Sequence, residues 1–188
     1  MDSMQALDTT SQHFISLVGQ VSAEQWDKPT PCEQWNVRSL VGHVIAGMHG
    51  YAELLHGAPA SRLAELVTQQ STIGGNDVRA AVIDAAAQAR AAFAEPGAPE
   101  RTVHHPMGDL PGSQLLRMRI LDNVVHGWDL ATAVHLPVEI DEALAEKLYQ
   151  GLLPRADALP ATGYFAPPRR SLASGAGPQE RLLTLVGR

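Results

Sequence analysis

The sequence predicts an all-α protein organised as a four-helix bundle, and three observations support this. Four segments of roughly 17–22 residues repeat apolar residues at the three- and four-residue spacing of a helix face. The segments between them contain proline and glycine, which end helices. One short stretch reads as extended chain, so strands are expected to contribute little.

The first two helices of the bundle are expected at residues 3–20 and about 37–55. Between them, Pro29 and Pro31 exclude a continuous helix through the segment WDKPTPCEQWNV. Asn36 can begin the second helix, because its side-chain oxygen can accept a free backbone N–H of the first turn. This second helix carries one broad apolar stripe: Leu40, Val41, Val44, Ile45, Met48, Tyr51, Leu54 and Leu55.

The third bundle helix is expected at about residues 78–94, after a turn, a short helix over residues 61–69 and a loop. Asn76 or Asp77 can provide its N-terminal cap. The segment VRAAVIDAAAQARAAFA is rich in alanine, which has the highest helix propensity and lets neighbouring helices approach closely. Residues 102–105 are expected to be extended.

The fourth bundle helix is expected at about residues 113–134, followed by a fifth helix at residues 139–153. After Pro160 the chain is rich in glycine and proline, so an irregular tail is expected, packed by Tyr164 and Phe165. The segment QERLLTLVGR should add a last helical turn or two. The chain is short enough to form a single domain over residues 1–188.

Charge and composition exclude several classes of partner. The net charge is −6 and the basic residues are scattered, with Arg169–Arg170 the densest basic spot, which argues against nucleic acid. No apolar run approaches the roughly 18–20 residues of a membrane span, and the N-terminus lacks the pattern of a secretory signal. A single cysteine excludes an internal disulfide and fits a reducing cytoplasm.

Three polar residues of the fourth helix share one of its sides. Asp122, His126 and Asp129 lie within about 60° of one another at 100° per residue. They can form a solvated face. Alternatively they are buried, since the surrounding helix is apolar almost all round and no Lys or Arg occurs between residues 120 and 134. Buried carboxylates need partners.

His43 on the second helix is the natural partner of this polar face. By itself it can be a hydrogen-bonded core residue. Together with Asp122 and His126 it would supply two imidazoles and a carboxylate from facing helices, a set that suits a divalent transition metal with open positions. Gly42 and Gly47 beside it leave room for a close neighbour or a ligand.

Four other histidines and the cysteine are not expected to bind metal. His49 and His56 are predicted to face solvent. His104 and His105 are adjacent in an extended segment, so their side chains point to opposite sides. Cys32 has no basic residue beside it to activate the thiol and is interpreted as packed.

Three segments together resemble a known family. TPCEQWNVRSLVGHVIAG, DNVVHGWDLATA and the tail GYFAPP…PQERLLTLVGR resemble actinobacterial metal-binding proteins of the DinB-like superfamily. These proteins are related to the N-terminal domain of mycothiol-dependent maleylpyruvate isomerase. The resemblance covers nearly the whole chain, and the order and spacing of the three segments make it fairly specific.

The resemblance implies a DinB-like four-helix bundle with an extra C-terminal helix and an irregular tail. It also implies a metal between the second and fourth helices, held by His43, Asp122 and His126. The isomerase branch typically has glutamate where this chain has Asp122, whose side chain is one methylene shorter. Asp129 would orient a ligand imidazole from behind, or serve packing or a loop N–H.

The resemblance further implies a cytoplasmic, divalent-metal-dependent enzyme that transfers or isomerises a small molecule with the help of a thiol. Zinc is the expected metal, with nickel or iron as alternatives, and mycothiol is the expected co-substrate. A homodimer is also implied. Two other functions stay open: a non-catalytic protein that binds a metal or small molecule, and a repurposed biosynthetic enzyme that uses the bundle pocket.

Overall fold

The computed structural model describes residues 1–168 and 171–188, so the basic pair Arg169–Arg170 lies outside the described residues. The chain comprises two compact units, Met1–Pro137 and Val138–Arg188, and each is described by itself. Helices dominate both units, as the sequence predicts. That the whole chain is a single domain stays a prediction.

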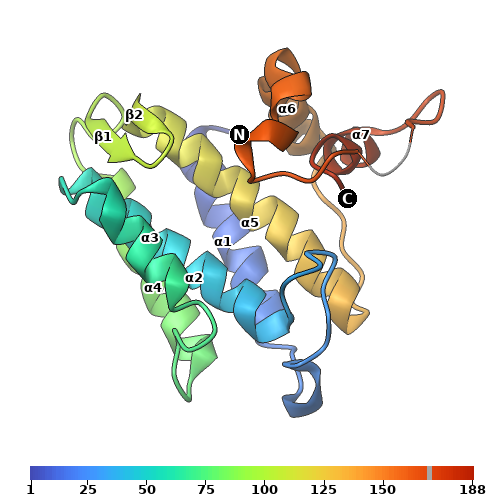
Figure 1. Cartoon of the computed structure of the whole chain (residues 1–188), viewed down its shortest axis with the longest axis horizontal. Helices are drawn as coiled ribbons and strands as arrows, with labels where there is room; N and C mark the ends of the chain where they lie inside the picture. The colour runs from blue at the N-terminus through green and yellow to red at the C-terminus, as the bar shows by residue number, and fades with distance from the viewer. Residues whose placement is uncertain (169–170) are drawn as a thin grey trace. The chain divides into compact units, whose positions relative to one another are not determined.

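Four long helices form the first unit: α1 (Ser3–Val18), α2 (Val37–Leu55), α4 (Val78–Phe93) and α5 (Gly112–Val134). They run side by side in Figure 1, and α1 and α2 each pack against both α4 and α5. The helix α3 (Ala60–Thr68) lies against α2. The strands β1 (Thr102–His105) and β2 (Gly108–Pro111) form an antiparallel hairpin between α4 and α5, with Thr102 opposite Pro111.

Capping residues determine where α2 and α4 begin. Asn36 Oδ1 accepts the backbone N–H of Ser39 at 2.9 Å, and Asp77 Oδ1 accepts that of Ala80 at 2.9 Å. These bonds satisfy backbone donors that a helix leaves free at its first turn. The helix predicted at residues 37–55 therefore coincides with α2. Of the two predicted caps of the third bundle helix, Asp77 rather than Asn76 caps α4.

The core of the first unit lies between these four helices. α2 is apolar round most of its circumference, with Leu40, Val41, Val44 and Ile45 all at 0% exposure. Helices buried on nearly all sides belong at the centre of a bundle. α5 is buried along much of its length, and four of its polar side chains are held inside the protein: Arg119, Asn123, His126 and Asp129.

Gly42 is the point where α2 passes closest to the chain that follows α3. A Cβ at position 42 would lie 1.7 Å from the backbone oxygen of Gln70, whereas a Cβ at Gly127 of α5 would meet its nearest neighbour at 3.8 Å. The first contact is with backbone and cannot be relieved by a side-chain rotation. The space predicted beside Gly42 therefore accommodates a neighbouring segment.

Gly42→Ala is expected to lower the free energy of unfolding by about 2 kcal/mol because the backbones must separate. Gly127→Ala is the matched control: its Cβ fits, so the higher helix propensity of alanine should raise stability by up to about 1 kcal/mol. Urea denaturation of both variants measures the difference. Equal stability of the two would contradict the close approach at position 42.

The second unit contains α6 (Glu142–Leu152), two short 3₁₀ segments (Leu153–Ala158 and Pro160–Thr162) and α7 (Pro178–Leu185), with α6 packed on α7. The fifth helix is shorter than predicted at both ends. Asp141 caps its start, with Oδ1 accepting the Leu144 N–H at 2.8 Å, and Pro154 of the first 3₁₀ segment stops it from continuing. The predicted packing role of Tyr164 is wrong: its side chain is 57% exposed.

None of the helices in residues 1–168 and 171–188 is long and apolar enough to cross a lipid bilayer.

Candidate metal centre

α2 and α5 bring His43, Asp122 and His126 together. Asp122 Oδ1 lies 3.3 Å from His126 Nε2 and 3.7 Å from His43 Nε2. The two imidazole rings are edge to face, with centroids 5.1 Å apart. One ligand atom from each residue lies within 4.8 Å of the others, so the three residues form a group that can hold a metal ion.

The spacing of these atoms is compatible with a single bound ion. Two ligand atoms about 2.1 Å from one tetrahedral ion are about 3.4 Å apart, and the distances of 3.3 and 3.7 Å bracket that value. At 3.7 Å the pair His43–Asp122 is too long for a hydrogen bond. Two neutral nitrogens and one carboxylate oxygen are also donors that zinc accepts.

The group is only partly closed to solvent. The side chains of His43 and Asp122 are 21% and 25% exposed, and that of His126 is 10% exposed. A solvated polar face was one prediction for Asp122, His126 and Asp129, and it is wrong for His126 and for Asp129, which is 0% exposed. The side chains of the other two residues remain partly exposed.

Arg119 is the site residue that the sequence analysis missed. Its side chain is 1% exposed, and its Nη2 bonds Asp122 Oδ2, the carboxylate oxygen that does not face the histidines. Nη1 donates to the Val44 carbonyl at 3.3 Å, and the guanidinium lies 5.6 Å from the centre of the Tyr51 ring. Arg119 therefore holds Asp122 with one oxygen directed at both imidazoles.

Two features of the sequence are connected with the place of Arg119 in the site. Arg119 is three residues before Asp122, the spacing of an ion pair along a helix. Gly47 faces it from α2: a Cβ at position 47 would lie 2.3 Å from Arg119 Nη1. The second glycine of the segment LVGHVIAG thus makes room for a neighbouring guanidinium rather than for a ligand.

The charges at the site shift the pKa values of the three residues. Burial alone would raise the pKa of Asp122, but the charges of Arg119 and His126 and the contacts with both imidazoles hold it well below its ordinary value. Burial alone would lower the pKa of His126. The charge of Asp122 and the hydrogen bonds that His126 makes with Asp122 and Asp129 raise this pKa well above its ordinary value. Without a metal, Asp122 and His126 are therefore an ion pair.

His43 differs from His126 in its protonation. Burial lowers its pKa, and the contact with Asp122 offsets this only in part. Its Nδ1 is buried and has no hydrogen-bond partner among residues 1–168 and 171–188. A neutral imidazole can coordinate a metal directly, so His43 is available as a ligand without losing a proton.

Asp129 stands behind His126 on the same helix. Its Oδ2 lies 3.1 Å from His126 Nδ1, and the carboxylate is entirely buried. An imidazole whose Nδ1–H bonds a carboxylate presents Nε2 to a metal, which is a common arrangement behind ligating histidines. The predicted role of orienting a ligand imidazole is compatible with this contact.

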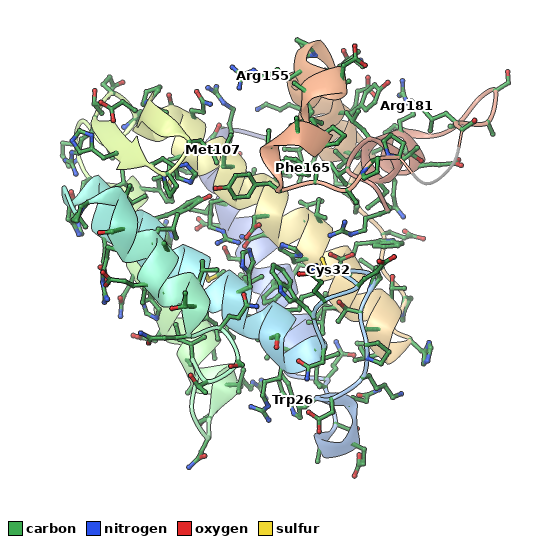
Figure 2. The ribbon with its side chains drawn as sticks, viewed as in Figure 1. Trp26, Cys32, Met107, Arg155, Phe165 and Arg181 are labelled. Atoms are coloured by element: carbon green, nitrogen blue, oxygen red, sulfur yellow. The ribbon has the colours of Figure 1, made fainter. Side chains whose placement is uncertain are left out.

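The loop of residues 26–36 covers the other side of the two imidazoles. The Trp35 ring lies 4.4 Å from the His43 ring and 5.6 Å from the His126 ring, measured between centroids. Thr30 Oγ1 bonds the Trp35 carbonyl at 2.9 Å, which holds the loop in a tight turn. Trp35 thereby restricts both rings, and Cys32 of the same loop lies beside α5 (Figure 2).

The other histidines lie outside this group. His49 bonds Gln88 and His56 bonds Glu95 at the surface, although His49 is half-buried rather than fully exposed. In β1, His104 is exposed and His105 is buried, as the alternation of a strand predicts. Burial lowers the pKa of His105.

A cavity of about 510 Å³ opens elsewhere in the first unit, near the end of α1 and the start of α4. It is lined in part by Trp26, Arg38 and Arg79 and by none of His43, Asp122 and His126. The group formed by His43, Asp122 and His126 is therefore not at the base of this cavity.

Comparison with known proteins identifies the family and relatives of this chain. Residues 7–131 match the family of mycothiol maleylpyruvate isomerase N-terminal domains. Two uncharacterised proteins of Mycobacterium tuberculosis, from strains CDC 1551 / Oshkosh and ATCC 25618 / H37Rv, are each 30% identical over 145 residues, which is 77% of this chain and 74% of the relative.

Two crystal structures share the fold: mycothiol-dependent maleylpyruvate isomerase and its histidine-to-alanine mutant. Each has a TM-score of 0.66, with 18% and 17% sequence identity respectively, and each match covers 80% of this chain and 68% of the other. At this identity the likeness concerns the fold, which is the predicted DinB-like helical bundle. With two thirds of its length matched, the chain belongs to the mycothiol maleylpyruvate isomerase N-terminal domain family.

Proposed function

We propose that the chain is a divalent-metal-dependent enzyme that transfers or isomerises a small molecule with the help of a thiol. The convergence of His43, Asp122 and His126 from two helices supports this most directly, because their donor atoms have the spacing of ligands around one ion. In this proposal zinc is the metal, with nickel and iron as alternatives for the same donors.

A divalent ion at this position supplies Lewis acidity, which lowers the pKa of a bound thiol or water and polarises a carbonyl. The protein residues hold the geometry. Arg119 keeps one oxygen of Asp122 occupied, so that the other faces the two Nε2 atoms. Trp35 covers the imidazoles on one side and excludes water there.

Membership of the family supports a thiol as co-substrate. The related isomerase is described as mycothiol-dependent, and we propose mycothiol as the co-substrate of this chain. A thiolate is the nucleophile of such reactions, since the neutral thiol is a poor one. The partial exposure of His43 and Asp122 supports access for a small molecule. A homodimer is also proposed, which light scattering would test.

A turnover assay tests the proposed activity. Zinc-loaded protein is incubated with mycothiol, or with a second thiol such as cysteine, and a panel of small electrophiles that includes maleylpyruvate. Loss of free thiol and formation of product are followed. Turnover is expected to need the thiol and to disappear in protein stripped of metal and in His43→Ala, while His49→Ala, a surface histidine of the same helix, keeps it.

The competing function is a non-catalytic protein that binds a small molecule in the cavity of about 510 Å³ near the start of α4. The position of this cavity away from the metal-binding group is the observation that favours it. Absence of turnover with every thiol and electrophile, together with ligand binding that Arg38→Ala and Arg79→Ala weaken and His43→Ala does not, would support this function instead.

A further inference from the structure

Cys32 has a fixed position in the loop that covers the metal-binding group. Its backbone N–H donates to Thr30 Oγ1 at 3.2 Å, and its carbonyl accepts the N–H of Trp35 at 2.8 Å. Pro29 and Asn36 form a bridge at the base of the loop. The backbone on both sides of Cys32 is therefore held, and the direction of its side chain is set by the loop.

The Cys32 thiol reaches the residue behind His126. Its Sγ lies 3.3 Å from Asp129 Oδ2, the same oxygen that lies 3.1 Å from His126 Nδ1. Asp129 is 0% exposed, so its charge depends on donors inside the protein. Cys32 and His126 both point at one oxygen of this buried carboxylate, from the loop and from α5 respectively.

We propose that Cys32 is a positioning residue for His126, acting through Asp129. The S–H of Cys32 donates a hydrogen bond to Asp129 Oδ2 and holds that oxygen opposite His126 Nδ1. In the metal-bound state the remaining proton of the imidazole then stays on Nδ1, and Nε2 is left to coordinate the ion beside Asp122 Oδ1. This inference rests on the proposed metal site, because it assigns Cys32 a role in keeping Nε2 available as a ligand.

Two contacts from the same loop therefore act on the imidazoles in different ways. The Trp35 ring restricts His43 and His126 from one side. Cys32 acts on the Nδ1 side of His126, through Asp129. Since the loop contains both Trp35 and Cys32, the folding of the loop is coupled to the orientation of the imidazoles that would bind the metal.

A different role for the thiol is that of a metal ligand. Ligand atoms of Cys32, His126 and Asp129 also lie within 4.8 Å of one another. An ion there would have to displace the hydrogen bond between His126 Nδ1 and Asp129, which is already made at 3.1 Å. We therefore favour the positioning role, and the stoichiometry of bound zinc separates the two.

The test compares Cys32→Ala with Cys32→Ser, which keeps a hydrogen-bond donor. Zinc affinity is measured by competition with a chromophoric chelator. The Nδ1–H of His126 is followed by NMR of the zinc-loaded protein through its chemical shift and its exchange with water. Gln34→Ala, an exposed position of the same loop, is the matched control, and circular dichroism confirms that each variant is folded.

Cys32→Ala is expected to weaken zinc binding about tenfold, the lower end of the effect of partners behind metal ligands. Its Nδ1–H signal should shift and exchange faster. Cys32→Ser should return both properties close to those of the wild type, and Gln34→Ala should leave them unchanged. A merely structural role would not be restored by a single hydroxyl.

Unchanged affinity and an unchanged Nδ1–H signal in Cys32→Ala would overturn the proposal while leaving the metal site intact. Two zinc ions per wild-type chain, falling to one in Cys32→Ala, would overturn it in favour of a cysteine ligand. If the wild-type chain binds no zinc at all, the proposed function fails first, and that outcome is distinct from both.

Discussion

His126→Ala is expected to abolish metal binding. Protein purified without a histidine tag and incubated with zinc should contain about one ion per chain, and the variant close to none. The expected loss of affinity exceeds about 100-fold, the upper end of what partners behind the ligands contribute. Elemental analysis after gel filtration measures the content, and chelator competition measures the affinity.

The reason lies in the double role of His126. Its Nε2 faces Asp122 Oδ1 at 3.3 Å, and its Nδ1 meets Asp129 at 3.1 Å, so alanine removes a donor atom and a partner of two carboxylates. His43→Ala removes only a donor and should show the same loss of zinc with a smaller loss of stability.

His104→Ala is the control for adventitious binding. This exposed histidine also contacts an aspartate, with Nδ1 2.7 Å from Asp109 Oδ1, but it lies on β1 outside the group of three. It should leave zinc content unchanged. Full zinc content in His126→Ala would refute the ligand assignment, and a wild-type chain that takes up no zinc would refute the metal site.

Arg119→Met is expected to give the largest loss of stability of the metal-free protein. Removing one member of a buried ion pair leaves the other charge uncompensated, and we expect the free energy of unfolding to fall by about 3 kcal/mol. Methionine fills similar space, and the side chain it replaces is 1% exposed. Urea denaturation in the presence of EDTA measures this loss.

Zinc is expected to reverse much of this loss. A divalent ion beside Asp122 replaces the positive charge of Arg119, and without the guanidinium the carboxylate attracts the ion more strongly. Zinc affinity should therefore rise at least about tenfold in the variant, and zinc should stabilise the variant more than the wild type.

Arg117→Met provides the matched control, since Arg117 is exposed on the same helix two residues away. It should change neither stability nor zinc affinity appreciably. If zinc stabilises Arg119→Met less than the wild type, Arg119 acts mainly by holding Asp122 in position, and the proposed competition between arginine and metal is wrong.

Local patterns predicted the helices well because helix formation depends on neighbours in the chain. The apolar stripe and Asn36 predicted α2 at its observed bounds, and alternation placed His104 and His105 on opposite sides of β1. The C-terminal segment was predicted less well. Packing rather than periodicity decides whether Tyr164 is covered, and it is exposed.

The candidate site was predicted in part for the same reason. The spacing of Asp122, His126 and Asp129 on one helix already placed them on a common side. Arg119 was not predicted, because the burial of an arginine depends on the residue that faces it. Here that residue is Gly47 of another helix. Cys32 was predicted to be packed, but its partner was not predictable from spacing.

The sequence by itself therefore determined the helical class, the bounds of α2 and the common face of Asp122 and His126, since each follows from contacts between residues a few positions apart. Only the tertiary structure decided that His43 approaches that face, that Arg119 occupies the other oxygen of Asp122, and that the Cys32 thiol meets Asp129. These contacts join residues as far as 97 positions apart. They depend on how helices and a loop pack, which no local pattern encodes.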